Sequence, residues 1–277
     1  MGFRINTNVS SIAAQRSLSA NNRESESTLS KMSSGSRITK AADDAAGLAI
    51  SEKLKARIKS NTQANRNAND GISMVQTAEG GLDEVSNILT RLRELSIQSA
   101  SDTVGNTERG FTNMEYQNLK QEVERIAQVT EFNGIKLLSG DGGELDFQIG
   151  VNNDDFQDRL KYDTASQNAK LDALGIDSIS VDSKEGAQTA LSTIDSAIEN
   201  VSGQRAALGA IQNRLISTSN NLQITNENLN AANSRIRDVD YAEVTAMNAK
   251  NNILNQAGTS VLAQANAQGQ NALRLIG

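Results

Sequence analysis

Apolar residues recur every seven positions through the C-terminal third of the chain. One seam runs without a break through Ile194, Val201, Leu208, Leu215, Leu222, Leu229 and Ile236. A second seam lies three residues further on, at Ala197, Gln204, Ile211, Thr218, Thr225, Ala232 and Val239. Two such seams, sustained over more than six heptads, predict a long supercoiled helix. The polar residues of the second seam can hold a partner helix in register at some cost in stability.

Two further long helices are predicted upstream. The first covers about residues 43–99, and the second covers about residues 108–129 with Leu119, Val123 and Ile126 at helical spacing. The apolar stripe of the first consists of Leu54, Ile58, Ala68, Ile72, Val75, Leu82, Val85, Leu89 and Leu92. Since one stripe cannot bury itself, each helix needs a partner. The sequence therefore predicts a mainly α fold, a long antiparallel helical bundle or coiled coil.

Two adjacent carboxylates stand at the front of the first of these helices, in "SRITKAADDAAGLAIS". Neighbouring residues on a helix project about 100° apart, so Asp43 and Asp44 cannot converge on one substrate bond. Negative charge in a first helical turn is favoured by the unpaired N–H groups and the helix dipole. We therefore interpret the pair as a helix start and place both residues in the first turn.

The period changes between residues 135 and 162. The stretch "IKLLSGDGGELDFQIG" offers an apolar run, a glycine-rich turn and then alternating Leu145, Phe147 and Ile149, which predicts a small β-hairpin region. Residues 163–184 are polar and irregular and are predicted to form a loop. Two shorter helices are predicted at the ends, over residues 5–32 and 242–276. Their apolar stripes are too thin to fold alone but suit packing on other copies.

Composition removes most chemistry. The 277 residues include no His, Cys, Pro or Trp, so a Ser-His-Asp triad, an HExxH zinc site and a thiolate nucleophile are excluded. Asp154 and Asp155 lack the spacing of a calcium loop, and "GDGG" lacks the GK[ST] of a phosphate loop. We expect no enzyme activity, no cofactor and no metal.

Charge and hydropathy limit the partners and the route out of the cell. A net charge of −6 speaks against nucleic acid and anionic membranes, because both attract basic proteins. No stretch approaches the ~18 apolar residues of a membrane span. The start of the chain, "MGFRINTNVSSIAAQRS", lacks the apolar region of a cleavable signal peptide.

Seven stretches together resemble bacterial flagellin, in that family's order and across nearly the whole chain. They are "INTNVSSIAAQRSL", "MSSGSRITKAADDAAGLAISEKL", "DGISMVQTAEGGLDE", "LTRLRELSIQSA", "TEFNGIKLLSG", "QRAALGAIQNRL" and "NLNAANSRIRDVDYAEVTAMNAKNNILNQAGTSVLAQAN". Because the middle, residues 140–184, is too short for the family's variable outer domains, the chain resembles a minimal flagellin of core domains only. A hook–filament junction protein shares the terminal helices and is the alternative, as is, more distantly, an enzyme or a flagellin with an enzymatic insert.

The resemblance implies an architecture and a function. Residues 1–40 and 240–277 would form an inner domain whose terminal helices pair as a coiled coil, and residues 41–239 would form a helical rod domain with the β-hairpin. The subunit would be exported through the flagellar secretion channel and polymerise into the extracellular flagellar filament, without a cleavable signal peptide. Its partners would be other copies of itself, an export chaperone at the C-terminal helix, hook-associated and cap proteins, and a vertebrate Toll-like receptor of innate immunity.

Two sets of residues are candidates for these contacts. By resemblance, the receptor would contact Arg91, Leu95 and Glu115; by their place on the thin terminal stripes, the assembly contacts are Ile5, Val9, Ile12, Leu254, Val261 and Ala265. Without the resemblance, Arg91 and Glu115 are interpreted as a solvated helix face and Leu95 as core packing.

Overall fold

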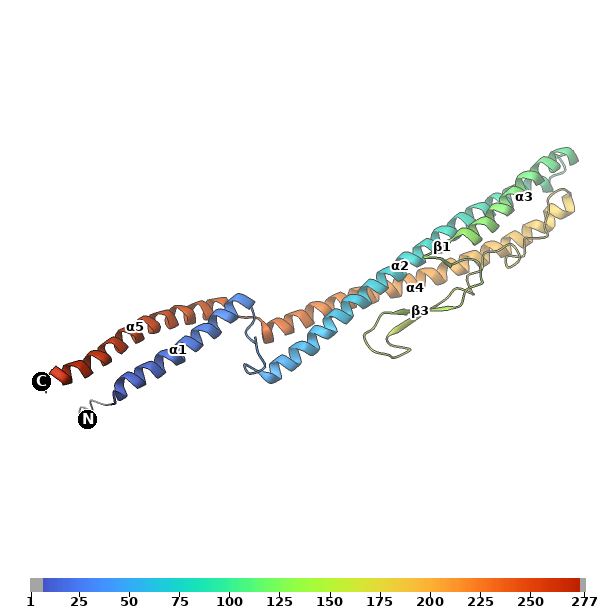
Figure 1. Ribbon diagram of the computed structural model, residues 1–277. Coiled ribbons are helices and arrows are strands. Elements are labelled where there is room, and N and C mark those ends of the chain that lie inside the picture. Colours follow the sequence, from blue (N-terminus) through green and yellow to red (C-terminus); the bar gives the residue numbers. More distant parts are fainter. Residues whose placement is uncertain (1–6, 275–277) are drawn as a thin grey trace. The chain divides into compact units, whose positions relative to one another are not determined.

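A computed structural model describes residues 7–274, with side chains from residue 7 to residue 267. In order, its helices are α1 (Val9–Ser34), α2 (Ala45–Ala100), α3 (Asn106–Val129), α4 (Lys184–Arg237) and α5 (Tyr241–Arg274) (Figure 1). The four short strands are β1 (Glu131–Phe132), β2 (Ile135–Lys136), β3 (Glu144–Gln148) and β4 (Arg159–Asp163). The predicted mainly α fold, with its long helices and small β region, is confirmed.

The chain forms two compact units. A terminal unit takes in the chain up to Arg57 and from Asn228 onwards, and a central unit is Ile58–Glu227. α2 and α4 each contribute to both units. The domain borders near residues 40 and 240 that the resemblance implies stay a prediction.

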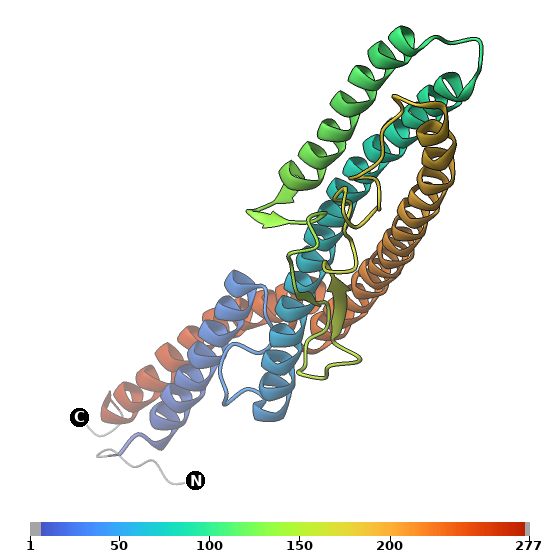
Figure 2. The same cartoon turned by 90° about the vertical axis from the view of Figure 1, so that its right-hand side faces the viewer.

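The core of the central unit lies between α2, α3 and α4, which run side by side in both views (Figures 1 and 2). α2 and α4 are antiparallel, because Arg93 pairs with Asp195 near one end and Asn65 with Ser219 near the other. The fully buried apolar side chains of α2 include Ala68, Val75, Ala78, Leu82, Val85, Leu89 and Leu92, and they belong to one core with Ile194, Ala197, Val201, Leu208 and Leu215 of α4. The stripe and the seam found in the sequence are thus the two sides of one core.

Two cationic side chains of α3, those of Arg109 and Lys120, are buried. Arg109 donates to the backbone oxygens of Ser99 and Ser101 and to the side chain of Asn106, so it binds the last turn of α2 and the loop that follows. Lys120 donates to the backbone oxygens of Asp177 and Ile179. Burial lowers the pKa of Lys120. Both side chains fix chain segments that have no regular hydrogen-bonding partner.

The β region pairs differently from the prediction. β2 pairs with β1, which precedes it, through a two-residue turn in which Asn133 and Gly134 both have positive φ. β3 pairs with β4, placing Leu145 opposite Tyr162 and Phe147 opposite Leu160. The prediction of a hairpin closed by "GDGG" was wrong, because Leu137 and Leu138 enter the core instead of pairing with β3. Between β4 and α4 the chain is a loop, as predicted.

The terminal unit is built on the pairing of α1 with α5. Polar side chains join the two helices. The Asn21 side chain donates to the backbone oxygen of Asn251 and to the side-chain oxygen of Asn255, and the Ser11 hydroxyl donates to the side chain of Asn266. α1 ends at Gly35, whose φ of 67° suits a residue without a side chain. The next residues are joined to the end of α4, since Arg37 N–H donates to the Arg237 oxygen and Val239 N–H to the Gly35 oxygen.

The acidic pair before α2 does start the helix, but not from within its first turn. Asp44 accepts the Gly47 N–H through its side chain and the Leu48 N–H through its carbonyl, so it is the N-cap of a helix that begins at Ala45. The Asp43 carboxylate accepts the N–H groups of Thr39 and Lys40 and the Thr39 hydroxyl. These bonds, those from the backbone of Lys40 and Thr39 foremost, lower the pKa of Asp43. The prediction that Asp43 and Asp44 lie in the first turn was therefore wrong, because they precede the first residue of α2 by two residues and by one.

Candidate functional site

Apolar side chains lie exposed along both terminal helices. On α1, Val9 and Ile12 are 63% and 48% exposed, and Ile253 is the most exposed large apolar side chain of α5 up to residue 267. Leu254 and Val261 are 46% and 56% exposed. Ile5 lies outside the described residues. Four of the six assembly candidates therefore stand on the surface of the terminal unit.

Ala265 has a different place. It is buried, and its backbone oxygen accepts a hydrogen bond from the Asn8 side chain at the start of α1. The same inward face of α5 carries Val244 and Asn251, which are also buried. Ala265 thus packs within the α1–α5 pair, while Leu254 and Val261 lie beside that inward face.

The receptor candidates Arg91 and Glu115 meet on the surface of the central unit. Nε and Nη2 of Arg91, on α2, donate to Oε1 of Glu115, on α3, at 3.1 and 2.9 Å, and Nη1 donates to Glu94 at 2.9 Å. The hydrogen bonds to Glu94 and to Glu115 raise the pKa of Arg91 above its usual value. About half of each side chain of the Arg91–Glu115 pair remains exposed, so a binding partner can reach them both.

Leu95 lies one helical turn further along α2 and is only 2% exposed. It belongs to the apolar core of the central unit. The three receptor candidates are close along α2 and α3, but only the two charged ones are on the surface.

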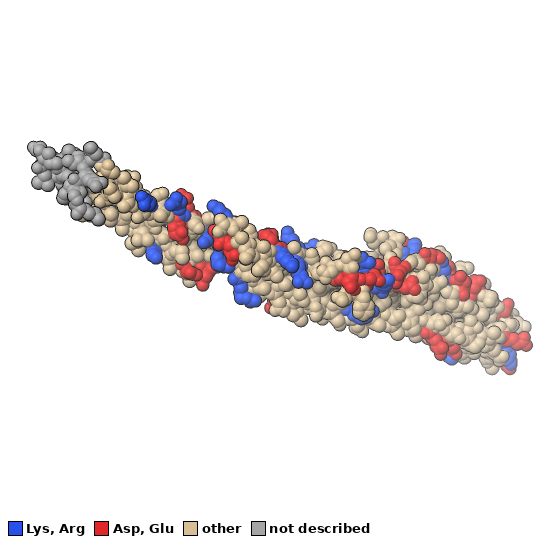
Figure 3. All heavy atoms as spheres, turned by 90° about the horizontal axis from the view of Figure 1, so that it is seen from below, with Lys and Arg blue, Asp and Glu red and all other residues tan. Residues whose placement is uncertain are grey.

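Other ion pairs cross between the helices of the central unit. Arg205 of α4 pairs with Asp83 of α2, and Lys184 pairs with Asp102. On the face drawn in Figure 3, basic and acidic side chains lie close together at several places, as such pairs require. Exposed ion pairs contribute little to stability, so their role is mainly in register and solubility.

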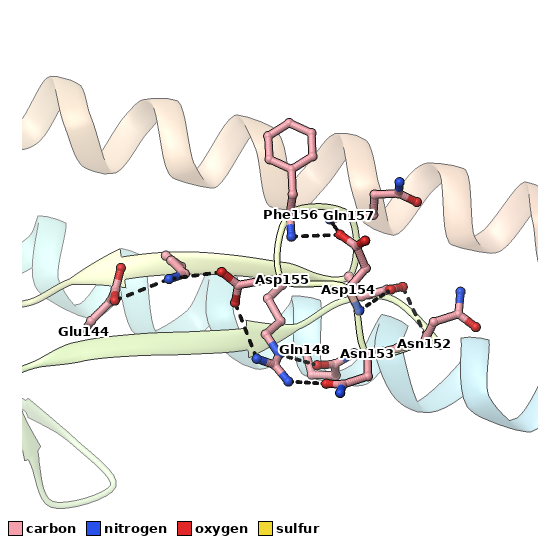
Figure 4. Close-up of polar contacts among 11 residues, drawn as sticks. Glu144, Gln148, Asn152, Asn153, Asp154, Asp155, Phe156 and Gln157 are labelled. Carbon is pink, nitrogen blue, oxygen red and sulfur yellow. Dashed lines mark hydrogen bonds and ion pairs between the residues drawn. The ribbon is translucent and has the colours of Figure 1, made fainter.

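The loop between β3 and β4 holds a feature that the sequence analysis missed. Phe156 is 93% exposed and is the most exposed large apolar side chain among the described residues. Below it the loop is tightly bonded: buried Asp158 accepts the N–H groups of Asn152 and Asp154, and Asp154 accepts those of Phe156 and Gln157. Figure 4 shows the ring pointing away from these bonds. The two aspartates that were compared with a calcium loop therefore have other partners. Asp154 accepts backbone N–H groups, and Asp155 forms ion pairs with Arg159 and Lys161.

Within residues 7–274, no group of three or more Asp and Glu side chains is arranged to hold a metal ion. In that range no helix combines the length and the apolar character needed to cross a membrane.

Comparison with known proteins identifies the family. The profile described as the bacterial flagellin N-terminal helical region matches residues 5–142, and that of the bacterial flagellin C-terminal helical region matches residues 191–276. The chain is 44% identical over 274 residues to a flagellin of Halalkalibacterium halodurans, covering 98% of this chain and 99% of that one.

Two further relatives agree. A flagellar filament core protein of Treponema maltophilum is 41% identical over 284 residues, covering 98% of this chain and 99% of its own length. The crystal structure of Bacillus cereus flagellin is similar at a TM-score of 0.50 and 29% identity, covering 57% of this chain and 88% of that one. With both terminal regions matched and its relatives aligned over almost their whole length, the chain belongs to the bacterial flagellin family.

Proposed function

We propose that this flagellin polymerises through the exposed apolar faces of α1 and α5, each copy covering the face that another leaves open. Flagellins are structural subunits of the extracellular flagellar filament, and this chain shares that role. The proposal rests on the distribution of side chains in the α1–α5 pair. Polar side chains join the two helices, and large apolar side chains are exposed, namely those of Val9, Ile12, Leu254 and Val261. Such a surface gains apolar burial only when copies associate.

Leu254→Asp tests the proposal. A buried, unpaired carboxylate costs several kcal/mol, and even ~3 kcal/mol for each added subunit raises the concentration needed for growth more than a hundredfold. The measurement is light scattering during growth from filament seeds, with circular dichroism of the monomer to check folding. Gln256→Asp, on the opposite side of α5, is the matched control. Growth of the Leu254 variant at the wild-type critical concentration would exclude this face as a contact.

A position at the hook–filament junction is the alternative role within the same type of architecture. It predicts short assemblies that stop growing, whereas a filament subunit elongates without limit from seeds. Electron microscopy of the seeded wild-type chain separates the two.

We further propose export through the flagellar secretion channel without a cleavable signal peptide, with a chaperone on α5 before assembly and hook-associated and cap proteins as filament-end partners. The support for a chaperone is again the unburied apolar face of α5. Mass determination of the protein from the culture medium tests the export route, because a cleaved signal would shorten the chain.

A second proposed function is recognition by the flagellin-sensing Toll-like receptor at Arg91 and Glu115, with Leu95 supporting α2 from the core. The support is that the two charged candidates lie side by side and half exposed. Arg91→Asp should weaken receptor signalling, because it reverses a charge at the contact. Arg93→Asp is the matched control, since Arg93 is similarly exposed and paired with an aspartate. Equal signalling from both variants and the wild-type monomer would contradict the proposal.

A further inference from the structure

The tip of the β3–β4 loop, residues 154–157, presents Phe156 to solvent on a fixed support. The carboxylates of Asp158 and Asp154 accept four backbone N–H groups of this loop, those of residues 152, 154, 156 and 157. Gly150 also lies so close to Asp158 that a side chain there would collide with it. Preorganisation of this kind lowers the entropy lost when a protruding side chain docks. Phe156 therefore has the properties of a binding anchor.

The chemistry around the ring indicates what it binds. Asp154 and Asp155 flank it, so a complementary surface must be apolar and basic. Asp155 already pairs with Lys161 and Arg159 but keeps 64% of its side chain exposed. The central unit as a whole is acidic, with fourteen Lys and Arg against twenty-five Asp and Glu.

The chain itself offers such a surface in the terminal unit, which has thirteen Lys and Arg against eight Asp and Glu. On α2, Ile50, Lys53 and Arg57 follow one another at helical spacing i, i+3 and i+7, so they share a face. Ile50 is half exposed, and within the described residues neither Lys53 nor Arg57 has an ion-pair partner. We call these three residues the basic face.

We infer that the loop tip around Phe156 of one copy docks on the basic face of a second copy. The inference deepens the proposed function, on which it rests, by naming a second contact of the polymer. Tip and face are different surfaces, so the contact is head-to-tail and leaves one of each free on every dimer. A head-to-tail contact that does not close into a ring produces an open helical polymer.

Phe156→Ala is the first test. Since the ring is exposed in the monomer, its removal should leave circular dichroism and the melting temperature unchanged. Truncation of an anchoring aromatic should raise the critical concentration for seeded growth about tenfold or more, while Phe111→Ala, at an exposed aromatic of α3 outside the loop, should leave it unchanged. Growth of the Phe156 variant at the wild-type critical concentration overturns the inference and leaves the proposed function standing. A wild-type chain that does not elongate overturns both.

Cross-linking shows whether the contact joins different chains. The protein has no cysteine, so single cysteines can be placed by Gln157→Cys at the tip and Ala46→Cys one turn before Ile50 on the same side of α2. A mixture of these two chains, polymerised and treated with a short bis-maleimide, should give a covalent dimer that neither chain gives alone. Asn118→Cys, exposed on α3, replaces Ala46→Cys in the control. Absence of the dimer from the tip–face mixture, or equal yield with the control, overturns the inference.

Discussion

The central unit and the α1–α5 pair are both helical, but they distribute polar and apolar side chains in opposite ways. In the central unit, Leu82, Leu89 and Leu92 are fully buried, and ion pairs such as Arg93–Asp195 lie outside. In the α1–α5 pair, asparagine and serine side chains join the helices, while Ile253, Leu254 and Val261 are exposed. The first arrangement is complete in a single chain. The second leaves large apolar side chains exposed in the single chain.

The largest expected effect is on the free energy of unfolding, and it distinguishes a buried leucine of the central unit from an exposed leucine of α1. Leu89→Ala should lower the free energy of unfolding by about 2–5 kcal/mol, because it leaves a cavity between α2 and α4. Leu29→Ala, at a side chain of α1 that is 53% exposed, should change it by about 0.5 kcal/mol at most. Urea unfolding of the monomer measures both. Similar losses for the two variants would remove the contrast between the regions.

Alkaline pH should act on the central unit. Burial raises the pKa of Tyr116 and of Tyr162 to about 12 each. In the unfolded chain these phenols ionise near pH 10, so the unfolded state loses protons first and stability falls between pH 10 and 12, by about 2–3 kcal/mol per tyrosine. Tyr116→Phe and Tyr162→Phe should each reduce that fall in urea midpoint. The matched control is Tyr241→Phe, at the exposed tyrosine of α5; an equal benefit there would contradict the assignment.

Removing a polar contact should loosen the terminal pair alone. Asn251 is buried against α1, and its side chain donates to the Thr28 hydroxyl. Asn251→Ala should destabilise the α1–α5 pair by about 1–3 kcal/mol. Hydrogen exchange should show faster exchange in α1 and α5 with unchanged protection in α3. Asn252→Ala, exposed on the same helix, is the control; faster exchange throughout the chain would mean that the two regions unfold together.

The smallest effect is expected at Asp43. Because its folded pKa is lowered, its contribution is present above the unfolded value and is lost as pH falls through the lowered folded pKa. Observed by NMR, the carboxyl carbon should titrate below the usual value of 3.8. Thr39→Val, which removes one of the three donors, should move its midpoint upward. No movement would show that the backbone donors alone determine it.

Prediction from the sequence succeeded where one periodicity governed a long segment. The heptads of residues 194–236 and the stripe of residues 54–92 predicted α4 and α2, because repeated burial on one face leaves a repeated signal. The prediction of strand pairing failed because an apolar run before "GDGG" resembles a strand in either case, whether its leucines belong to a β-ladder or pack into a core. The dipeptide Asn133-Gly134, a strong signal for a two-residue hairpin turn, would have identified β1–β2.

The candidate sites were less predictable than the fold. The burial of Arg109 and Lys120 was not predicted, since sequence pattern cannot show that loop carbonyls need a donor. Phe156 gave no periodic signal, being a single aromatic in a polar loop. The assembly and receptor contacts stay predictions, because they depend on other molecules.

The pairing of α1 with α5 also determines the order in which the chain can fold. Asn8 reaches the backbone of Ala265 across 257 positions of sequence, and Asn21 that of Asn251 across 230. Contacts so distant form slowly, and none can form before the final helix exists. A nascent chain can pair β1 with β2 as soon as they leave the ribosome. α1 is among the first segments made, but its partner α5 is synthesised last. Throughout that interval α1 has no partner within its own chain, which makes it the segment most exposed to proteolysis and premature association during synthesis.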